Sequence, residues 1–373
     1  MKKISKKLMS AILVAGMTMV SLAGCGEGNS ESNKDGANDA QTSVGAHAIA
    51  GNIWGQGVNA LDIIASECEY TQKACGNTFK VYNDNFTADT QASNIQSMAS
   101  SGVEGMMIFG SVPTLYSKIS STCSSAKIAF VFEDQIPSDE TILEELNKNE
   151  YYVGAVGTDN YAAGANVAKK MLENGITSAF TLGGAIGDVV HDARLAGFKD
   201  TFTAGGGNLV AEGHCDSPAD AATKGDDLIA ANGNVEGIYA LTGDFAIGAI
   251  TALSNHNANI PVYCSDTTAE SAAYIKSGEI VYGDGGSRIV TTIAAILLDN
   301  YLDGNVIKDA DGNAPYFGTI VPFEVNADNA DGYVEHFLNN HPMTEEQIQT
   351  LCGASYDDFV KFIAEYSYDS IVK

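Results

Sequence analysis

The chain has 373 residues, of which 45% are apolar, and a formal net charge of −27. This length is ample for two domains with cores of their own, and the strong negative charge argues against a nucleic-acid partner. Arginine occurs only at Arg194 and Arg288, so the chain cannot build an arginine cluster for a phosphate ester.

The chain begins with a predicted export signal. Four lysines stand in residues 1–7, and the apolar run 8–23 is too short to span a membrane as a helix. Leu22-Ala23-Gly24-Cys25 resembles a bacterial lipobox, in which cleavage before the cysteine leaves a lipid-modified N-terminus. We therefore predict a signal peptide over 1–24, lipid attachment at Cys25 and a polar tether over 25–45. An ordinary cleaved signal followed by a chance cysteine is the alternative.

From residue 46 onward, short apolar runs alternate with longer runs of helical periodicity. The predicted elements are strand 47–53, helix 58–74, strand 79–82, helix 90–101, strand 105–109, helix 114–124 and strand 126–132. Parallel strands joined by helices form a sheet that is covered by helices on both faces. The first part of the chain is therefore predicted to be an α/β lobe.

The same alternation then restarts. It predicts strand 152–156, helix 161–173, strand 178–182, helix 193–204, strand 209–212, helix 219–231, strand 237–241, helix 246–254 and strand 260–264. Helix 269–276, strand 281–282, helix 288–302 and a hairpin-like segment 303–325 are expected to complete both lobes. A helical tail follows, in which Thr344 and Gln347 fit a capping box.

The predicted fold class is α/β, with two doubly wound parallel-sheet lobes joined by a multi-strand hinge. The assigned parts are an N-terminal lobe of 46–154 with about 267–300, a C-terminal lobe of 155–266 with about 301–330, and a helical extension of 331–373.

Polar and aromatic side chains follow several predicted strands, where ligands of open parallel sheets bind. In the first lobe these are Trp54, Gln56, Asp84, Glu133 and Asp134, and in the second Asp192, Thr242, Asp244 and Asp266. Carboxylates accept hydrogen bonds from hydroxyl or ammonium groups, and an indole ring stacks on the apolar face of a sugar or base. Taken singly, each carboxylate can equally cap a helix, and the tryptophan can lie in a core.

Signatures of catalysis and of metal binding are missing from the sequence. Residues 183–187 do not match the dinucleotide fingerprint, and there is neither a nucleophile elbow nor a phosphate loop. Six cysteines beyond Cys25 are scattered without the spacing of a metal motif, and the chain is too large to require disulfides. We therefore predict no enzyme, no cofactor and no metal.

Several motifs together resemble the type I periplasmic binding proteins of the ribose- and galactose-binding group. They are residues 90–98 with 102–108, residues 156–164 at the crossing into the second lobe, the RxxGF match 194–198, the helix start 243–249, and the last strand and helix 260–266 with 275–278. The resemblance covers about residues 46–304.

This resemblance implies a lipid-anchored solute-binding subunit that captures a small polar molecule for an ABC transporter permease. The aromatic group that stacks on the sugar falls on Trp54, and the hinge aspartate that accepts sugar hydroxyls falls on Asp266. The family's other polar positions are changed: they fall on Glu133 with Asp134, on Asp192, on Thr242 and near Gly286. A ribose or galactose site is therefore not preserved.

The expected protein is an extracytoplasmic monomer, anchored at the outer face of the cell membrane, that binds a sugar or polyol. The predicted ligand-binding residues are Trp54, Gln56, Glu133, Asp134, Asp192, Thr242, Asp244 and Asp266. The alternatives are a ligand sensor for a membrane receptor, or a binder of a nucleoside or an amine-bearing solute. An extracellular hydrolase has less support, and a repressor is disfavoured because no helix-turn-helix precedes the first lobe.

Overall fold

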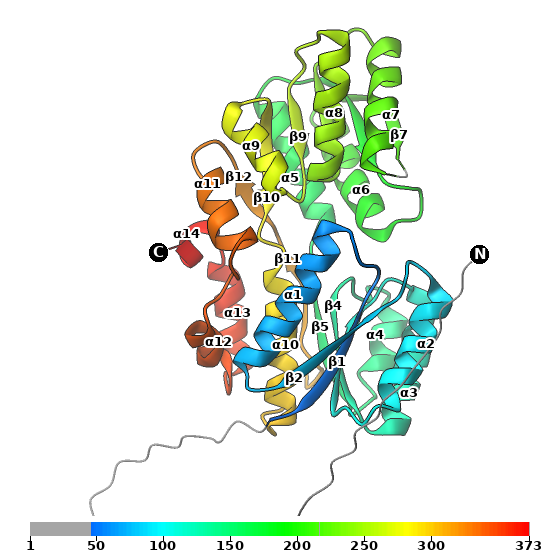
Figure 1. Ribbon diagram of the computed structural model, residues 1–373, viewed down its shortest axis with the longest axis vertical. Coiled ribbons are helices and arrows are strands. Elements are labelled where there is room, and N and C mark those ends of the chain that lie inside the picture. Colours follow the sequence, from blue (N-terminus) through cyan, green and yellow to red (C-terminus); the bar gives the residue numbers. More distant parts are fainter. Residues whose placement is uncertain (1–45, 216, 373) are drawn as a thin grey trace, which may run out of the picture. The chain divides into compact units, whose positions relative to one another are not determined.

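The computed structural model describes residues 46–215 and 217–372, and these form two α/β lobes (Figure 1). The predicted signal peptide, Cys25 and the tether lie outside the described residues. Each lobe contains one six-stranded sheet. The predicted fold class is therefore confirmed.

The first lobe is built on a sheet of order β11-β5-β4-β3-β1-β2, in which all paired strands are parallel. Its strands are β1 (Ala48–Ile53), β2 (Thr78–Asn83), β3 (Gly105–Phe109), β4 (Ala129–Asp134), β5 (Tyr152–Thr158) and β11 (Tyr316–Ile320). Its helices are α1 (Asn59–Ala74), α2 (Ala88–Ala99), the 3₁₀ turn Pro113–Leu115, α3 (Tyr116–Ala126), α4 (Glu140–Leu146) and α10 (Ile289–Leu302).

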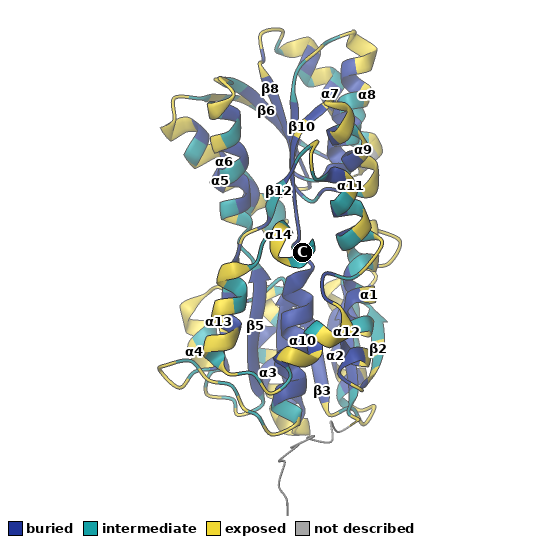
Figure 2. Ribbon diagram, turned by 90° about the vertical axis from the view of Figure 1, so that its left-hand side faces the viewer, coloured by how far each residue is buried: buried dark blue, intermediate teal, exposed yellow. Residues whose placement is uncertain are grey.

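Alternation along the strands gives this lobe two separate cores. In β3, Met107 and Phe109 face the core formed with α1 and α10, whereas Met106 and Ile108 face the core formed with α2 and α3. A sheet buried on both faces needs apolar residues at successive positions, which is why its inner strands β1, β3, β4 and β5 are mostly apolar. Figure 2 shows α10 as a buried helix, in agreement with its apolar sequence.

The second lobe has a sheet of order β12-β10-β9-β8-β6-β7, parallel except for the antiparallel pair β10 and β12. Its strands are β6 (Ser178–Gly183), β7 (Asn208–His214), β8 (Gly237–Ala240), β9 (Val262–Cys264), β10 (Ile280–Gly285) and β12 (Phe323–Val325). Its helices are α5 (Asn160–Glu173), α6 (Val189–Ala204), α7 (Pro218–Ala231), α8 (Gly243–His256), α9 (Ala269–Ser277), α11 (Ala330–Tyr333) and the π-helical turn Val334–Leu338.

The structure corrects the predicted boundaries between the lobes. Residues 267–285 were expected in the first lobe, but α9 is a short crossover that returns β10 to the side of β9 in the second sheet. The segment 303–325 is not a hairpin, because β11 pairs with β5 and β12 pairs with β10. The chain therefore crosses between the two lobes at residues 158–160, 285–289 and 320–323.

The C-terminal extension contributes to both lobes. Its helices are α12 (Glu345–Leu351), α13 (Tyr356–Glu365) and α14 (Tyr368–Val372), and the predicted capping box of Thr344 and Gln347 is present. Residues of α12 and α13 join the core of α1 and α10, whereas Tyr368 and Ile371 pack on the core of the second lobe. Tyr366 contacts both cores, and its hydroxyl donates to the carbonyl of Gly286 at 2.6 Å.

Candidate solute-binding site

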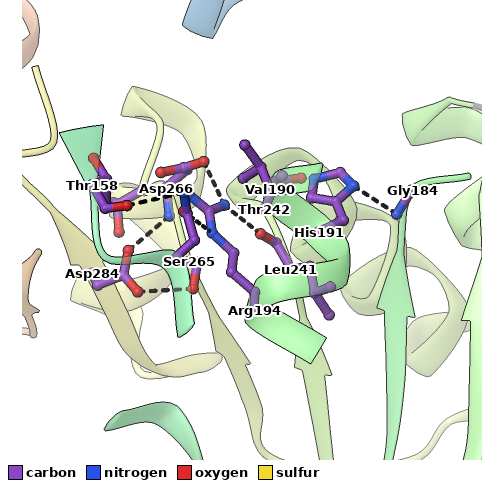
Figure 3. Close-up of polar contacts among 12 residues, drawn as sticks. Thr158, Gly184, Val190, His191, Arg194, Leu241, Thr242, Ser265, Asp266 and Asp284 are labelled. Atoms are coloured by element: carbon purple, nitrogen blue, oxygen red, sulfur yellow. Dashed lines mark hydrogen bonds and ion pairs between the residues drawn. The ribbon is translucent and has the colours of Figure 1, made fainter. Parts of the chain in front are cut away.

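A buried arginine organises the strand ends of the second lobe (Figure 3). Arg194 lies in α6 with 3% of its side chain exposed. Its guanidinium donates to the carbonyl of Leu241 at 2.9 Å and to Oδ2 of Asp266 at 2.6 Å. Its Nε donates to Oδ1 of Asn160 at 3.0 Å. Because the guanidinium is held by acceptors from three segments, its position at the ends of the strands is fixed.

Asp266 is held at the end of β9 by a second carboxylate. Its backbone has a φ of +48°, and its amide donates to Oδ1 of Asp284 at 2.9 Å. Ser265 donates its hydroxyl to Oδ2 of the same Asp284 at 2.8 Å. Burial raises the pKa of Asp284 to about 6, although Arg194 acts in the opposite direction. The Asp266 side chain remains 28% exposed, so part of this fixed carboxylate is accessible.

Two aromatic rings lie at the corresponding edge of the first sheet. Trp54 follows β1 and is partly exposed, and Phe86 follows β2 with 48% of its surface exposed. The rings meet edge to face with centroids 6.4 Å apart, and the amide of Phe86 donates to the carbonyl of Trp54 at 2.8 Å. A Cβ atom at Gly55 would lie 2.0 Å from Cζ of Phe86, so this contact requires glycine. The pair provides an apolar surface beside the predicted site.

The two carboxylates that follow β4 have different surroundings. Asp134 is half-buried, with a φ of +59°; burial and the nearby Asp266 raise its pKa to about 7, whereas Arg194 lowers it. Glu133 has no exposed surface, and it accepts a hydrogen bond from the hydroxyl of Thr291 at 2.7 Å. The predicted ligand contact of Glu133 therefore does not fit the structure, because its side chain lies inside the first lobe.

Burial, followed by the charge of Asp134, raises the pKa of Glu133 to about 8. The folded protein therefore binds more protons than the unfolded chain between pH 4 and pH 8, and stability falls as the pH rises through this range. We expect Glu133→Gln to increase the free energy of unfolding at pH 8 by on the order of 2 kcal/mol, and by much less at pH 5. Urea unfolding at both pH values measures this difference.

Glu69→Gln is the control, because Glu69 is exposed on α1. It should change the free energy of unfolding little at either pH. An equal effect of Glu133→Gln at pH 5 and pH 8 would contradict a raised pKa.

The remaining predicted residues lie in the loops and helix starts that follow strands, but they differ in how their side chains are used. Asp192 is exposed and accepts from the amide of Gly187 at 3.0 Å, and Thr242 caps α8 by accepting from the amide of Phe245. Gln56 is exposed and accepts from Asn83 at 3.3 Å.

Asp244 is half-buried in the first turn of α8. Burial, then the charges of Glu270 and Asp266, raise its pKa. Of the predicted second-lobe residues, Asp266 and Asp244 are thus the two whose charges interact.

Sequence reasoning missed Arg194, Phe86 and His191 as members of the site. In the sequence, Arg194 stands out only as part of the RxxGF match, and Phe86 is separated from β2 by two residues. His191 accepts from the amide of Gly184 at 2.8 Å through Nδ1, and burial lowers its pKa. A neutral imidazole can offer its second nitrogen as a donor to a solute. The available signal was that Arg194 is the arginine of the RxxGF match.

A family model described as a periplasmic binding protein domain matches residues 52–305. The chain belongs to the periplasmic binding protein family. This membership confirms the prediction of a binding protein rather than an enzyme. The ribose import binding protein RbsB of Haemophilus influenzae is 26% identical over 166 residues, which are 42% of this chain and 55% of that protein. The match thus spans just over half the length of that relative.

Several solved structures of sugar- and solute-binding proteins share the fold. A galactofuranose binding protein has a TM-score of 0.67 and 17% identity, covering 79% of this chain and 99% of that one. A solute binding protein of Actinobacillus succinogenes 130z with bound D-allose has a TM-score of 0.66 and 18% identity, covering 77% and 100%. The Caulobacter myo-inositol binding protein has a TM-score of 0.64 and 18% identity, covering 77% and 95%.

Among the described helices, none combines the length and apolar character needed to cross a membrane.

Proposed function

We propose that this chain is the solute-binding subunit of an ABC-type importer and that it captures a neutral sugar or polyol between its two lobes. The observation that carries the proposal is the exposed edge of Asp266, held in place by buried Arg194. A fixed carboxylate accepts hydrogen bonds from hydroxyl groups without having to be ordered on binding. Membership of the periplasmic binding protein family supports the same conclusion.

The charges around the site favour a neutral solute. Arg194 already balances Asp266, and the raised pKa of Asp134 allows this carboxyl to hold a proton near neutral pH and donate it to a hydroxyl oxygen. Trp54 and Phe86 supply an apolar surface for the carbon face of a ring. Solute contacts to both lobes would stabilise a closed arrangement that a permease can distinguish from the empty one.

The remaining parts of the proposal concern location and partners. The protein acts as a monomer outside the cytoplasm and is held at the outer face of the membrane by lipid on Cys25. Its partner is an ABC transporter permease. Cells that lack the gene for this protein would lose uptake of the labelled solute if the protein serves import. Unchanged uptake by these cells would support a ligand sensor instead.

A thermal-shift screen of the purified protein tests the solute class. The panel contains D-allose, myo-inositol, D-galactose and glycerol, together with a nucleoside and an amino sugar. A solute that binds only the folded protein raises its melting temperature. A shift with a sugar or polyol supports the proposal.

The amino sugar tests the second candidate, an amine-bearing solute. That candidate is favoured by the excess of Asp134, Asp244 and Asp266 over a single arginine. A shift with the amino sugar, and with no neutral sugar or polyol, would replace the first candidate by the second.

We expect Trp54→Ala and Asp266→Asn each to weaken solute binding by about 10-fold to 100-fold, because they remove the ring surface and the charged acceptor. Isothermal titration with the best solute of the screen measures the change. Tyr161→Phe is the control, since it removes only a surface hydrogen bond to Asp200. Unchanged affinity in both site variants would refute this site assignment.

A further inference from the structure

Two cysteines and one aspartate converge at a point that belongs to neither the solute site nor a sequence motif. Cys75 follows the last residue of α1, Asp299 lies in the last part of α10, and Cys352 follows the last residue of α12. One ligand atom from each lies within 4.8 Å of the other two. Since these residues are 75, 299 and 352 in the chain, their spacing gives no sign of the cluster.

The distance between the sulfur atoms suits a shared metal ion. Sγ of Cys75 and Sγ of Cys352 are 4.0 Å apart. Two thiolates on one tetrahedral zinc ion, each about 2.3 Å from the metal, are about 3.8 Å apart. A disulfide would instead require the sulfur atoms to approach to about 2.05 Å. Binding of a metal ion therefore requires a smaller movement of the two sulfur atoms than formation of a disulfide.

The carboxylate of Asp299 is oriented in the manner of a metal ligand. The side chain is fully buried, and its Oδ1 accepts from the amide group of Asn77 at 2.7 Å. Asn77 is itself oriented by donation to Oε1 of Gln72 at 2.9 Å. No nitrogen or hydroxyl group of the described residues donates to the other oxygen, Oδ2. A buried carboxylate with one oxygen held by an amide and with two thiols beside it is suited to bind a cation together with the thiolates.

The backbone on both sides of Cys352 is fixed to α10 and its following turn. Asn300 donates to the carbonyl of Leu351 at 3.0 Å and accepts from the amide of Gly353. Asn305 donates to the carbonyl of Ala354 at 3.1 Å. These bonds hold Cys352 in place opposite Cys75. Cys352 is partly exposed, so an ion and a fourth ligand from solvent can reach the cluster.

We propose that Cys75, Asp299 and Cys352 form a binding site for a thiophilic divalent ion of the zinc class. On binding, the two thiols release their protons to solvent and become thiolates, and Asp299 supplies a carboxylate oxygen. The ion joins the end of α1, α10 and the end of α12. It therefore fastens the C-terminal extension to the first lobe, independently of the solute that the protein carries.

Titration of the reduced full chain with Zn²⁺ and with Co²⁺ tests this site. We expect one Zn²⁺ per chain to survive gel filtration, and bound Co²⁺ to show a thiolate charge-transfer band. Both signals should be lost in Cys352→Ser and kept in Cys123→Ala, which removes a buried thiol on α3 that lies apart from the cluster. Asn77→Ser should weaken Zn²⁺ binding by about 10-fold to 100-fold through loss of the bond that orients Asp299.

The melting temperature of each metal-free variant shows whether it has folded. Equal Zn²⁺ retention by the full chain and by folded Cys352→Ser would overturn the proposal. So would a Cys75–Cys352 disulfide, found by peptide mapping in protein purified without reductant, because it would assign the pair to a covalent link.

Discussion

Replacement of Arg194 by methionine is expected to lower the free energy of unfolding by about 3–5 kcal/mol, because it leaves partly buried Asp266 and fully buried Asp284 without their cation. The same change should abolish the solute-induced thermal shift, since Asp266 loses the group that fixes its carboxylate. Urea unfolding and the solute screen measure the two effects separately.

Lys170→Met is the matched control for Arg194→Met. It also removes a cation from an ion pair, with Glu324, but both side chains are about one-third exposed. Exposed pairs contribute at most about 1 kcal/mol. If Arg194→Met were no more destabilising than Lys170→Met, the buried cluster would not be an important source of stability.

A second large effect is expected in the C-terminal extension, where Phe359→Ala should lower the free energy of unfolding by about 3–5 kcal/mol. Phe359 on α13 is fully buried, and its ring stacks near that of Phe317 in β11 at a centroid distance of 6.2 Å. Removal of the ring leaves a cavity between the extension and the first lobe. Urea unfolding with a single transition would measure the loss.

Val360→Ala provides the comparison on the same helix. Val360 is 42% exposed, so its truncation should change the free energy of unfolding by no more than about 0.5 kcal/mol. Similar values for the two variants would mean that α13 is an appendage rather than part of the core of the first lobe.

The alternation of strands and helices was sufficient to predict two parallel α/β lobes, because that pattern restricts the chain to few topologies. It could not place residues 267–285 or the strand β11 in the correct lobe. The six-residue strand β10 follows a nine-residue helix, and nothing in its composition distinguishes one sheet from the other. Pairing with β9 rather than with a strand of the first lobe is decided by tertiary contacts.

The strand-end rule selected Asp266 and Asp134, whose charges interact in the structure. The same rule also selected Asp84, which is fully buried and accepts hydrogen bonds from Asn52, Gln91 and Asn94. A sequence shows that a carboxylate follows a strand, but not whether neighbouring amides use both of its oxygens. This is why Asp84 belongs to the interior rather than to the accessible part of the site.

The path of the C-terminal extension affects the free energy that is required to move one lobe relative to the other. Residues 158–160, 285–289 and 320–323 join the lobes, and the extension passes from the second lobe to the core of α1 and α10 and back again at Tyr366. The hydroxyl of Tyr366 also donates a hydrogen bond to the carbonyl of Gly286, which lies in the connecting segment 285–289. Each additional connection between the lobes increases the resistance to bending at the hinge. In the proposed closure, a larger part of the solute-binding free energy would therefore be used to bring the two lobes together.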